Sequence, residues 1–97
     1  MTIARVYIMH AAEGKDATLE TALAKLADLV RKVPGSEGVE LLRDLGNERR
    51  FLFIEKWDSV ESHAAGLESL PQGALDDIGP ALDGPPDGAY FDYLKTV

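Results

Sequence analysis

The segment from Phe51 to Leu67 carries the side chains best suited to chemistry in this chain. Its sequence, FLFIEKWDSVESHAAGL, reads as a half-apolar strand that ends at Trp57 and runs into a helix. Asp58 or Ser59 can cap that helix, and Asp58 with Glu61 has the spacing of a capping box. A small α+β protein places a pocket at such a junction. Trp57 is therefore a candidate pocket residue, with burial in the core as the alternative.

His63 is the one titratable group on the inward side of the helix that follows. An imidazole titrates near neutral pH, and small changes in its surroundings move its pKa. His63 is thus the first candidate for a base or a hydrogen-bond donor toward a phenolic ligand. The alternative is a structural histidine that is hydrogen-bonded or partly exposed.

Two charged residues share strand faces with the aromatic candidates. Glu55 lies on the same face as Trp57, and Arg5 lies on the same face as Tyr7. If their strands are neighbours, the two charges form a buried ion pair, which either orients a ligand or is purely structural. The expected pocket lies between sheet and helices, and its predicted lining is Tyr7, Phe53, Trp57, Leu23, Leu26 and Leu67.

The elements that position these side chains follow from hydrophobic periodicity and from turn residues. The predicted strands are Ile3 to Ala11, Val39 to Leu45, Arg50 to Trp57 and Ala89 to Thr96, with a hairpin at residues 46–49. The predicted helices are Asp16 to Val33 and Ser59 to about Leu70, with a short or kinked helix between Ala74 and Leu82, where Gly79-Pro80 interrupts the pattern.

This order, β-α-β-β-α-(α)-β, predicts a single α+β domain over residues 1–97 with a ferredoxin-like, four-stranded antiparallel sheet. Both helices can cover only one face of such a sheet, yet both faces are apolar. The third strand alone places Phe51, Phe53 and Trp57 on one side and Leu52 and Ile54 on the other. A second copy of the chain is the economical cover for the other face, so a homodimer is expected.

The composition excludes several classes of partner. The 97 residues carry a formal net charge of -7, and the only adjacent basic pairs are Arg31-Lys32 and Arg49-Arg50, so no nucleic-acid footprint is present. There is no cysteine, there are two histidines, and no apolar run approaches the roughly 20 residues of a membrane helix. We expect a cytoplasmic protein that binds no metal, no nucleic acid and no membrane.

Several short segments, spread over nearly the whole chain, carry a resemblance to a known family. They are Glu13-Gly14-Lys15, Val33-Pro34-Gly35, Glu37-Gly38-Val39-Glu40-Leu41, Phe53-Ile54-Glu55-Lys56-Trp57 with Ser59 and Glu61, Gly79-Pro80-Ala81-Leu82 and Asp83-Gly84-Pro85-Pro86. In these segments the chain resembles the antibiotic biosynthesis monooxygenase (ABM) superfamily. The resemblance implies a dimeric α/β barrel built from two ferredoxin-like protomers.

The resemblance also implies an activity. The cofactor-free oxygenases of this superfamily let a deprotonated quinol or polycyclic phenol pass an electron to dioxygen inside an apolar pocket. On this interpretation His63 and Trp57 are the catalytic candidates. The candidates for substrate binding are Tyr7, Phe53, Arg5, Glu55 and Leu67.

Departures from the family pattern leave other functions open. At two places where many members carry histidine, this chain has Gly66 and, approximately, Pro71. The positions that surround the porphyrin in the haem-degrading branch match Tyr7, Gly66 and about Asp76, which cannot ligate iron in that manner, so no cofactor is expected. The alternative to an oxygenase is a non-catalytic dimeric protein that binds a small apolar or aromatic ligand in a stress or accessory role. An isomerase is a third interpretation, which the missing histidines disfavour.

Overall fold

The computed structural model describes residues 1–97 and contains four strands, two α-helices and one short 3-10 helix. In chain order these are β1 (Ile3–His10), α1 (Asp16–Arg31), β2 (Ser36–Asp44), β3 (Asn47–Trp57), α2 (Val60–Ser69), η1 (Gly79–Ala81) and β4 (Asp87–Asp92). The strands form one antiparallel sheet in the order β2-β3-β1-β4. The predicted ferredoxin-like α+β fold is thereby confirmed.

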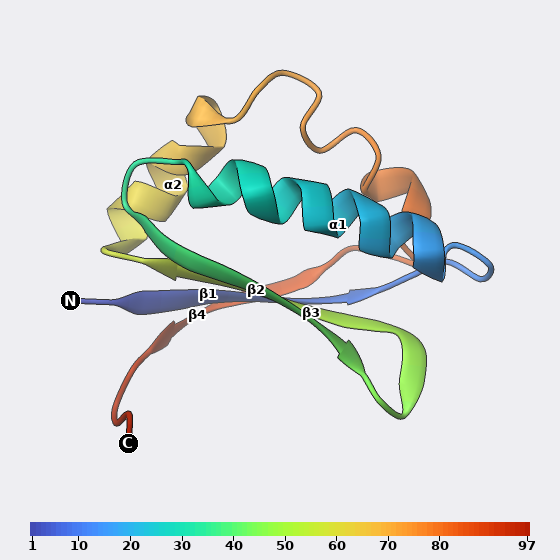
Figure 1. The fold of residues 1–97 in the computed structure, drawn as a ribbon, viewed down its shortest axis with the longest axis horizontal. Coiled ribbons are helices and arrows are strands. Elements are labelled where there is room, and N and C mark those ends of the chain that lie inside the picture. Colours follow the sequence, from blue (N-terminus) through green and yellow to red (C-terminus); the bar gives the residue numbers. More distant parts are fainter.

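Both helices lie on the same face of the sheet, and the opposite face carries no helix (Figure 1). The periodic apolar residues of α1 are the ones that turn toward the sheet, and Leu19, Leu23 and Leu26 are buried there. Phe51 and Phe53 of β3 meet them and are 1% exposed. The apolar core therefore lies between α1 and one face of β1 and β3.

The junction after Trp57 is built as expected in outline but not in detail. β3 ends at Trp57, and Ser59 is the N-cap of α2, where its hydroxyl accepts a hydrogen bond from the backbone N–H of Ser62 at 3.1 Å. The predicted capping box of Asp58 and Glu61 is wrong. Ser59 occupies the cap, so the residue three positions on is Ser62, and Glu61 instead places its negative charge in the first turn.

The segment between α2 and β4 is less regular than the sequence pattern suggested. Of the predicted short helix between Ala74 and Leu82, only the 3-10 turn η1 forms, because Pro80 lacks the N–H that a continued helix needs. β4 begins at Asp87 and ends at Asp92, two residues earlier at its start and four earlier at its end than predicted. Neither α-helix combines the length and the apolar character that crossing a membrane demands.

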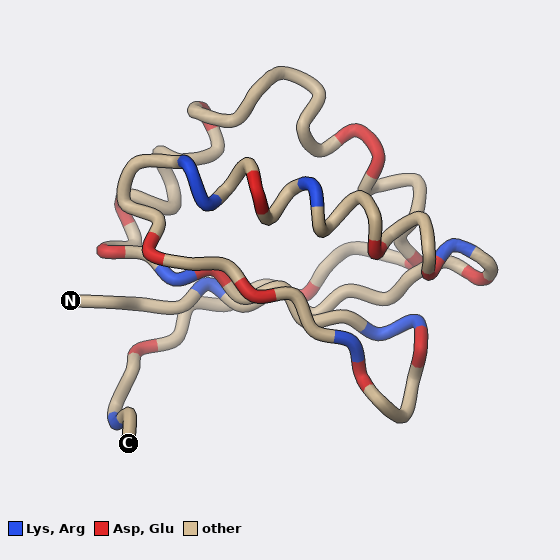
Figure 2. The backbone as a smooth tube through the Cα atoms, in the orientation of Figure 1, with Lys and Arg blue, Asp and Glu red and all other residues tan.

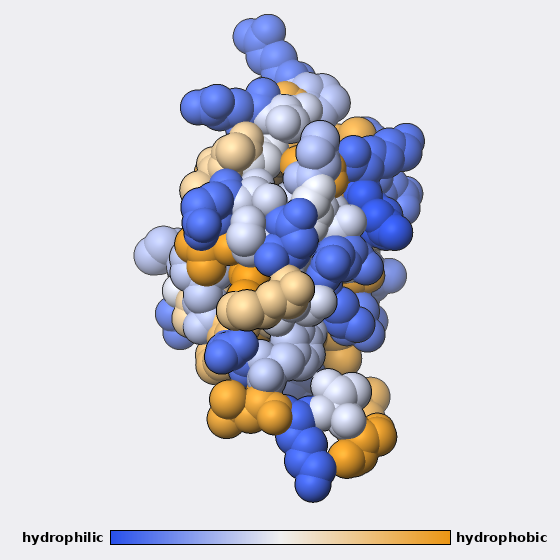
Figure 3. Space-filling model, turned by 90° about the vertical axis from the view of Figure 1, so that its left-hand side faces the viewer, coloured by the Kyte–Doolittle hydropathy of each residue, from blue (hydrophilic) through white to orange (hydrophobic).

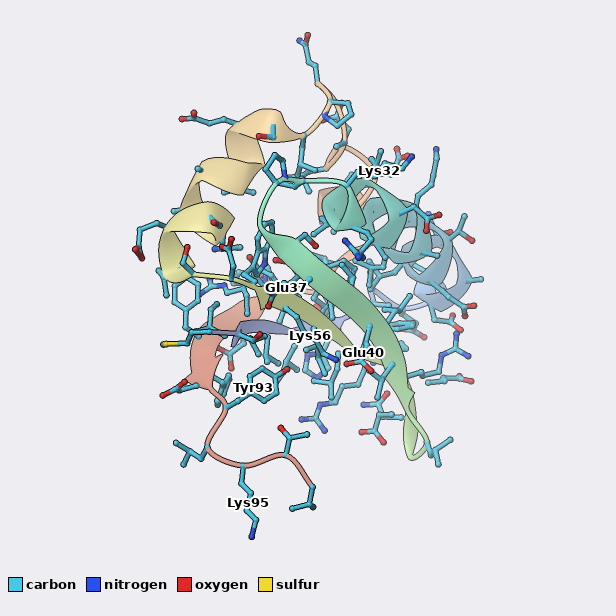
Figure 4. The ribbon with its side chains drawn as sticks, turned by 60° about the vertical axis from the view of Figure 1, so that its left-hand side comes forward. Lys32, Glu37, Glu40, Lys56, Tyr93 and Lys95 are labelled. Carbon is cyan, nitrogen blue, oxygen red and sulfur yellow. The ribbon has the colours of Figure 1, made fainter.

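The face of the sheet away from the helices carries apolar side chains as well. Leu42 is 44% exposed and Phe91 is 55% exposed, and Leu52 and Ile54 are half-buried. Tyr93 lies beyond β4 on this side, where the Lys56 and Glu40 side chains also lie near each other (Figure 4). Apolar atoms also gather at the lower tip of the molecule, where the C-terminal tail projects below the sheet (Figure 3).

Charged residues are distributed around the rest of the surface. Basic and acidic residues are interspersed along α1 and at the β2–β3 hairpin, and no continuous basic stripe is visible along the backbone (Figure 2). That the chain binds no nucleic acid stays a prediction.

Candidate functional site

A cavity of about 320 Å³ lies between the sheet and the helices. The C-terminal half of α1, the helix-facing side chains of β1 and β3, α2 and the irregular segment after it enclose this space. Most of the lining is apolar, and three side chains supply its titratable groups. The lining residues are Tyr7, Met9, Leu26, Val30, Val33, Phe53, Glu55, Trp57, His63, Gly66, Leu67, Leu70, Leu75, Ile78, Gly79 and Pro86.

Most of the residues predicted for the pocket lie in it. They are Tyr7, Leu26, Phe53, Glu55, Trp57, His63 and Leu67. Two predicted residues lie elsewhere. Leu23 is fully buried in the core and is absent from the cavity wall, because it lies one helical turn before Leu26 on α1. Arg5 belongs to β1, the strand between β3 and β4, and is absent from the cavity wall.

A buried carboxylate holds the tryptophan in place. The Trp57 indole Nε1–H donates a hydrogen bond of 3.0 Å to Glu55 Oε1, and Glu55 is only 5% exposed. The two residues are two positions apart on β3, so their side chains extend from the same face of the strand. The indole thereby gains the acceptor that a buried Trp N–H requires.

His63 lies at the centre of the polar end of the cavity. Its Nε2 is 2.9 Å from the Tyr7 hydroxyl, and its Nδ1 is 2.6 Å from the Tyr90 hydroxyl. Its Nε2 is also 3.6 Å from Glu55 Oε1. The imidazole packs edge-on against the Trp57 ring, with 5.6 Å between the ring centroids. Side chains from β1, β3 and β4 therefore surround one imidazole on α2.

Burial shifts the pKa of each of the three titratable groups in the cavity in the direction that favours the neutral form of the group. It raises the pKa of Glu55, although the Trp57 hydrogen bond and the Arg5 charge oppose this. It also raises the pKa of Tyr7 and lowers the pKa of His63, in the latter case with help from Arg5. The contact between His63 and Glu55 is consequently an ion pair only after the imidazole has gained a proton.

The predicted ion pair between Arg5 and Glu55 does not form. The strands are neighbours and the two residues face each other in register, yet no oxygen of Glu55 comes within 4.0 Å of the guanidinium. The guanidinium carbon lies instead 4.9 Å from the Tyr7 ring centre and 4.4 Å from the Tyr90 ring centre. Two aromatic faces attract this cation, while Glu55 Oε1 accepts its hydrogen bond from the Trp57 indole.

Comparison with known proteins identifies the family. The family described as antibiotic biosynthesis monooxygenase (ABM) matches residues 1–72 of the chain. The chain belongs to the ABM family. This confirms the resemblance found in its sequence segments. No curated protein matches the chain.

Solved structures share the fold over nearly the whole length of this ABM protein. SnoaB, a cofactor-independent oxygenase from Streptomyces nogalater, is 17% identical, with a TM-score of 0.84 over 99% of this chain and 96% of SnoaB. A candidate antibiotic biosynthesis monooxygenase from Bordetella bronchiseptica is 20% identical, with a TM-score of 0.85 over 97% and 98% of the two chains. Rv0793 from Mycobacterium tuberculosis is 13% identical, with a TM-score of 0.82 over 99% and 98%.

Gly66 explains one departure of this ABM chain from the pattern of its family. A Cβ atom at Gly66 would lie 3.0 Å from Trp57 Cη2 and 3.1 Å from Val33 Cγ1. A histidine at this place would therefore displace the indole. The missing side chain lets α2 approach Trp57 closely.

Tyr90 is the contact that sequence reasoning missed in the ABM site. Tyr90 falls within the strand predicted from Ala89 to Thr96, and nothing in the sequence links that strand to His63. The register shows the link, because Tyr90 pairs with Arg5 across β1 and β4. Gly88, two residues earlier on β4, leaves room for the Arg5 and Tyr7 side chains, since a Cβ there would lie 2.8 Å from Arg5 Nη2.

The acidic and imidazole side chains do not form a metal site. Nowhere in the structure do three or more His, Asp or Glu side chains converge in a way that could hold a metal ion. The polar end of the cavity instead consists of one carboxyl group, one imidazole and tyrosine hydroxyls. These are groups that accept, donate and transfer protons.

Proposed function

We propose that this ABM protein is a cofactor-independent monooxygenase that oxidises a quinol or a polycyclic phenol with dioxygen. The observation that carries the proposal is the composition of the cavity, which is apolar along most of its wall and has a buried imidazole at one end. The apolar wall, with Phe53, Trp57 and Leu67, would hold a flat aromatic ring and keep water from it. The imidazole would take up the phenolic proton.

The reaction divides into a proton transfer and an oxygen transfer. In an anthrol, the ring hydroxyl would lose its proton toward Tyr7 and His63, and the anion would give one electron to dioxygen. The superoxide and the ring radical then combine at the ring carbon opposite the hydroxyl. The resulting peroxide anion takes up the proton that the hydroxyl had lost. The hydroperoxide then loses water together with the hydrogen of that carbon and leaves a carbonyl group, so that one oxygen atom enters the quinone and the other leaves in water.

The protein would favour this reaction through the surroundings of His63. Burial lowers the pKa of the imidazole, which favours the neutral ring with one nitrogen free to accept a proton. Once it gains a proton, Glu55 Oε1 lies 3.6 Å from Nε2 and can stabilise the positive charge. Trp57 fixes that carboxyl group through its indole N–H.

A homodimer is part of the same proposal. The half-exposed apolar side chains on the helix-free face, with Phe91 and Leu42 among them, would be covered by the same face of a second copy.

The cytoplasmic location expected from the absence of cysteine stays a prediction.

Oxygen consumption tests the proposed reaction. Metal-stripped protein supplied with anthrols and hydroquinones should take up dioxygen above the buffer rate, and with an anthrol ¹⁸O₂ should label one oxygen of the quinone product. His63→Ala should lower kcat about 100-fold because the base is lost. His10→Ala is the matched control, because His10 is exposed at the end of β1. No uptake across the panel, or an unchanged rate in His63→Ala, would refute the proposal.

One observation favours the alternative of a binding protein without turnover. The hydrogen-bonding groups that project into the cavity from Glu55, His63 and Trp57 already have partners within the protein. A ligand held mainly by apolar contacts would then quench the fluorescence of Trp57, the only tryptophan, without consuming oxygen. If no aromatic ligand changes that fluorescence, this alternative fails.

A further inference from the structure

His63 connects two tyrosine hydroxyls that belong to different surroundings. The Tyr7 hydroxyl is 2.9 Å from Nε2, and Tyr7 lines the cavity. The Tyr90 hydroxyl is 2.6 Å from Nδ1, whereas Tyr90 does not line the cavity and is 40% exposed on the edge strand β4. The imidazole therefore lies between a group on the cavity side and a residue that reaches the surface.

The chemistry of a neutral imidazole makes this arrangement directional. One ring nitrogen carries a hydrogen and the other accepts one, so one tyrosine donates to the ring and the other accepts from it. When Tyr7 donates to Nε2, Nδ1–H donates to the Tyr90 oxygen. A proton that arrives at Nε2 can then leave from Nδ1 without any movement of the ring.

We propose that Tyr7, His63 and Tyr90 form a path that carries the phenolic proton of the substrate from the cavity to the surface. The inference rests on the proposed oxygenase function. The substrate O–H breaks as a new O–H forms on Tyr7, the Tyr7 proton moves to Nε2, the Nδ1 proton moves to Tyr90, and the Tyr90 proton passes to water. The reverse transfers return a proton to the peroxide oxygen that leaves as water, and they reset the three donors.

The groups around His63 favour an imidazole that passes a proton on over one that stays protonated. Tyr7 and Arg5 face it from β1, Glu55 faces it from β3 and Tyr90 faces it from β4. The Arg5 guanidinium lies against both tyrosine rings and disfavours a second positive charge on the imidazole, while a Glu55 carboxylate can stabilise one briefly. The imidazole thus accepts a proton during transfer and is neutral at rest.

Tyr90 is a positioning residue in this path, and its hydroxyl can be removed alone. Tyr90→Phe keeps the ring that contacts Arg5. Tyr93→Phe is the matched control, because Tyr93 is similarly exposed, at 43%, and lies on the other side of the sheet (Figure 4). We expect Tyr90→Phe to lower kcat about 10-fold with KM unchanged, and added imidazole buffer to restore the rate as its concentration rises. A wild-type kcat, or a loss that buffer does not restore, would overturn the path.

A second measurement does not depend on turnover. The chain has two histidines, so the ¹⁵N NMR signals of His63 are readily assigned by comparison with His10→Ala. Tyr90→Phe removes the acceptor of Nδ1–H, and the tautomer with hydrogen on Nε2 should therefore gain population, whereas Tyr93→Phe should change nothing. An unchanged tautomer in Tyr90→Phe would refute the path, while absence of oxygen uptake by the wild-type protein would refute the oxygenase.

Discussion

The two faces of the sheet carry similar apolar residues but bury them to different extents. On β3, Phe51, Phe53 and Trp57 point toward the helices and are at most 2% exposed. Leu52 and Ile54 alternate with them and point to the helix-free face, where they are half-buried. Figure 1 shows why, because α1 and α2 cover one face only.

The difference between the faces concerns chemistry as well as burial. On the covered face, β3 also places Glu55 among apolar side chains, and burial raises its pKa. On the helix-free face, Lys56 of the same strand has a surface ion pair with Glu40, with 3.7 Å between the charged atoms. Water screens such a pair. On the covered face water is excluded, so the polar groups of Glu55, Trp57 and His63 interact more strongly with one another. The cover therefore decides which face can hold an active site.

The largest expected effect is the difference in stability between two variants, each of which removes a phenylalanine from one face of the sheet. Phe51→Ala should lower the free energy of unfolding by about 3–5 kcal/mol, because it leaves a void in the core. Phe91→Ala, from the helix-free face, should lower it by less than about 1 kcal/mol at a dilution where subunits are separate. Urea unfolding measures both values.

The same pair tests the homodimer. If the helix-free face forms a subunit interface, Phe91→Ala should weaken association in sedimentation experiments. Equal losses of stability for the two variants would remove the distinction between the faces. A lone wild-type subunit at micromolar concentration would refute the homodimer.

A smaller effect should come from the charge buried on the covered face. The pKa of Glu55 is raised above its ordinary value of 4.5, so the native protein retains a proton that the unfolded chain releases. Its contribution to stability therefore falls as the pH rises from 4.5 through the raised pKa. Glu55→Gln keeps an acceptor for the indole N–H and should be increasingly more stable than wild type over that range.

The pH profile of wild type also contains an opposite slope from His63. Its pKa is lowered below 6.5, so the unfolded chain binds more protons there and stability falls as the pH drops below 6.5. The two slopes have opposite signs, so a wild-type stability that falls relative to Glu55→Gln as the pH rises reports the raised pKa of Glu55. A difference that does not change with pH would contradict the raised pKa.

The smallest effect is expected where the covered face meets α2. Gly66→Ala gains about 1 kcal/mol of helix propensity, and its new Cβ would lie 3.0 Å from Trp57 Cη2. We expect a net change in stability within about 1 kcal/mol, together with a shift of the Trp57 emission. Ala65→Gly, at an exposed position of the same helix, measures the propensity alone. An unshifted emission would mean that the indole does not fill this contact.

Local patterns were sufficient for most of the fold. The three- and four-residue spacing in α1 and the alternation in β3 predict which side chains face each other across the core, because these periods are properties of the backbone. They also place His63 on the inward side of α2. The stretch before β4 was harder to predict, since Pro80 and several glycines leave it no regular period.

The polar end of the cavity required the tertiary structure. The sequence by itself determined that Trp57, Glu55 and Arg5 lie on strand faces from which they could meet, and that His63 could approach them. Only the packing of four separate elements decided that Glu55 binds the indole, that Arg5 lies against two tyrosine rings, and that Tyr90 reaches His63. Hydrogen bonds between residues as distant as Tyr7 and His63 depend on strand register and helix position together, and no local pattern encodes both.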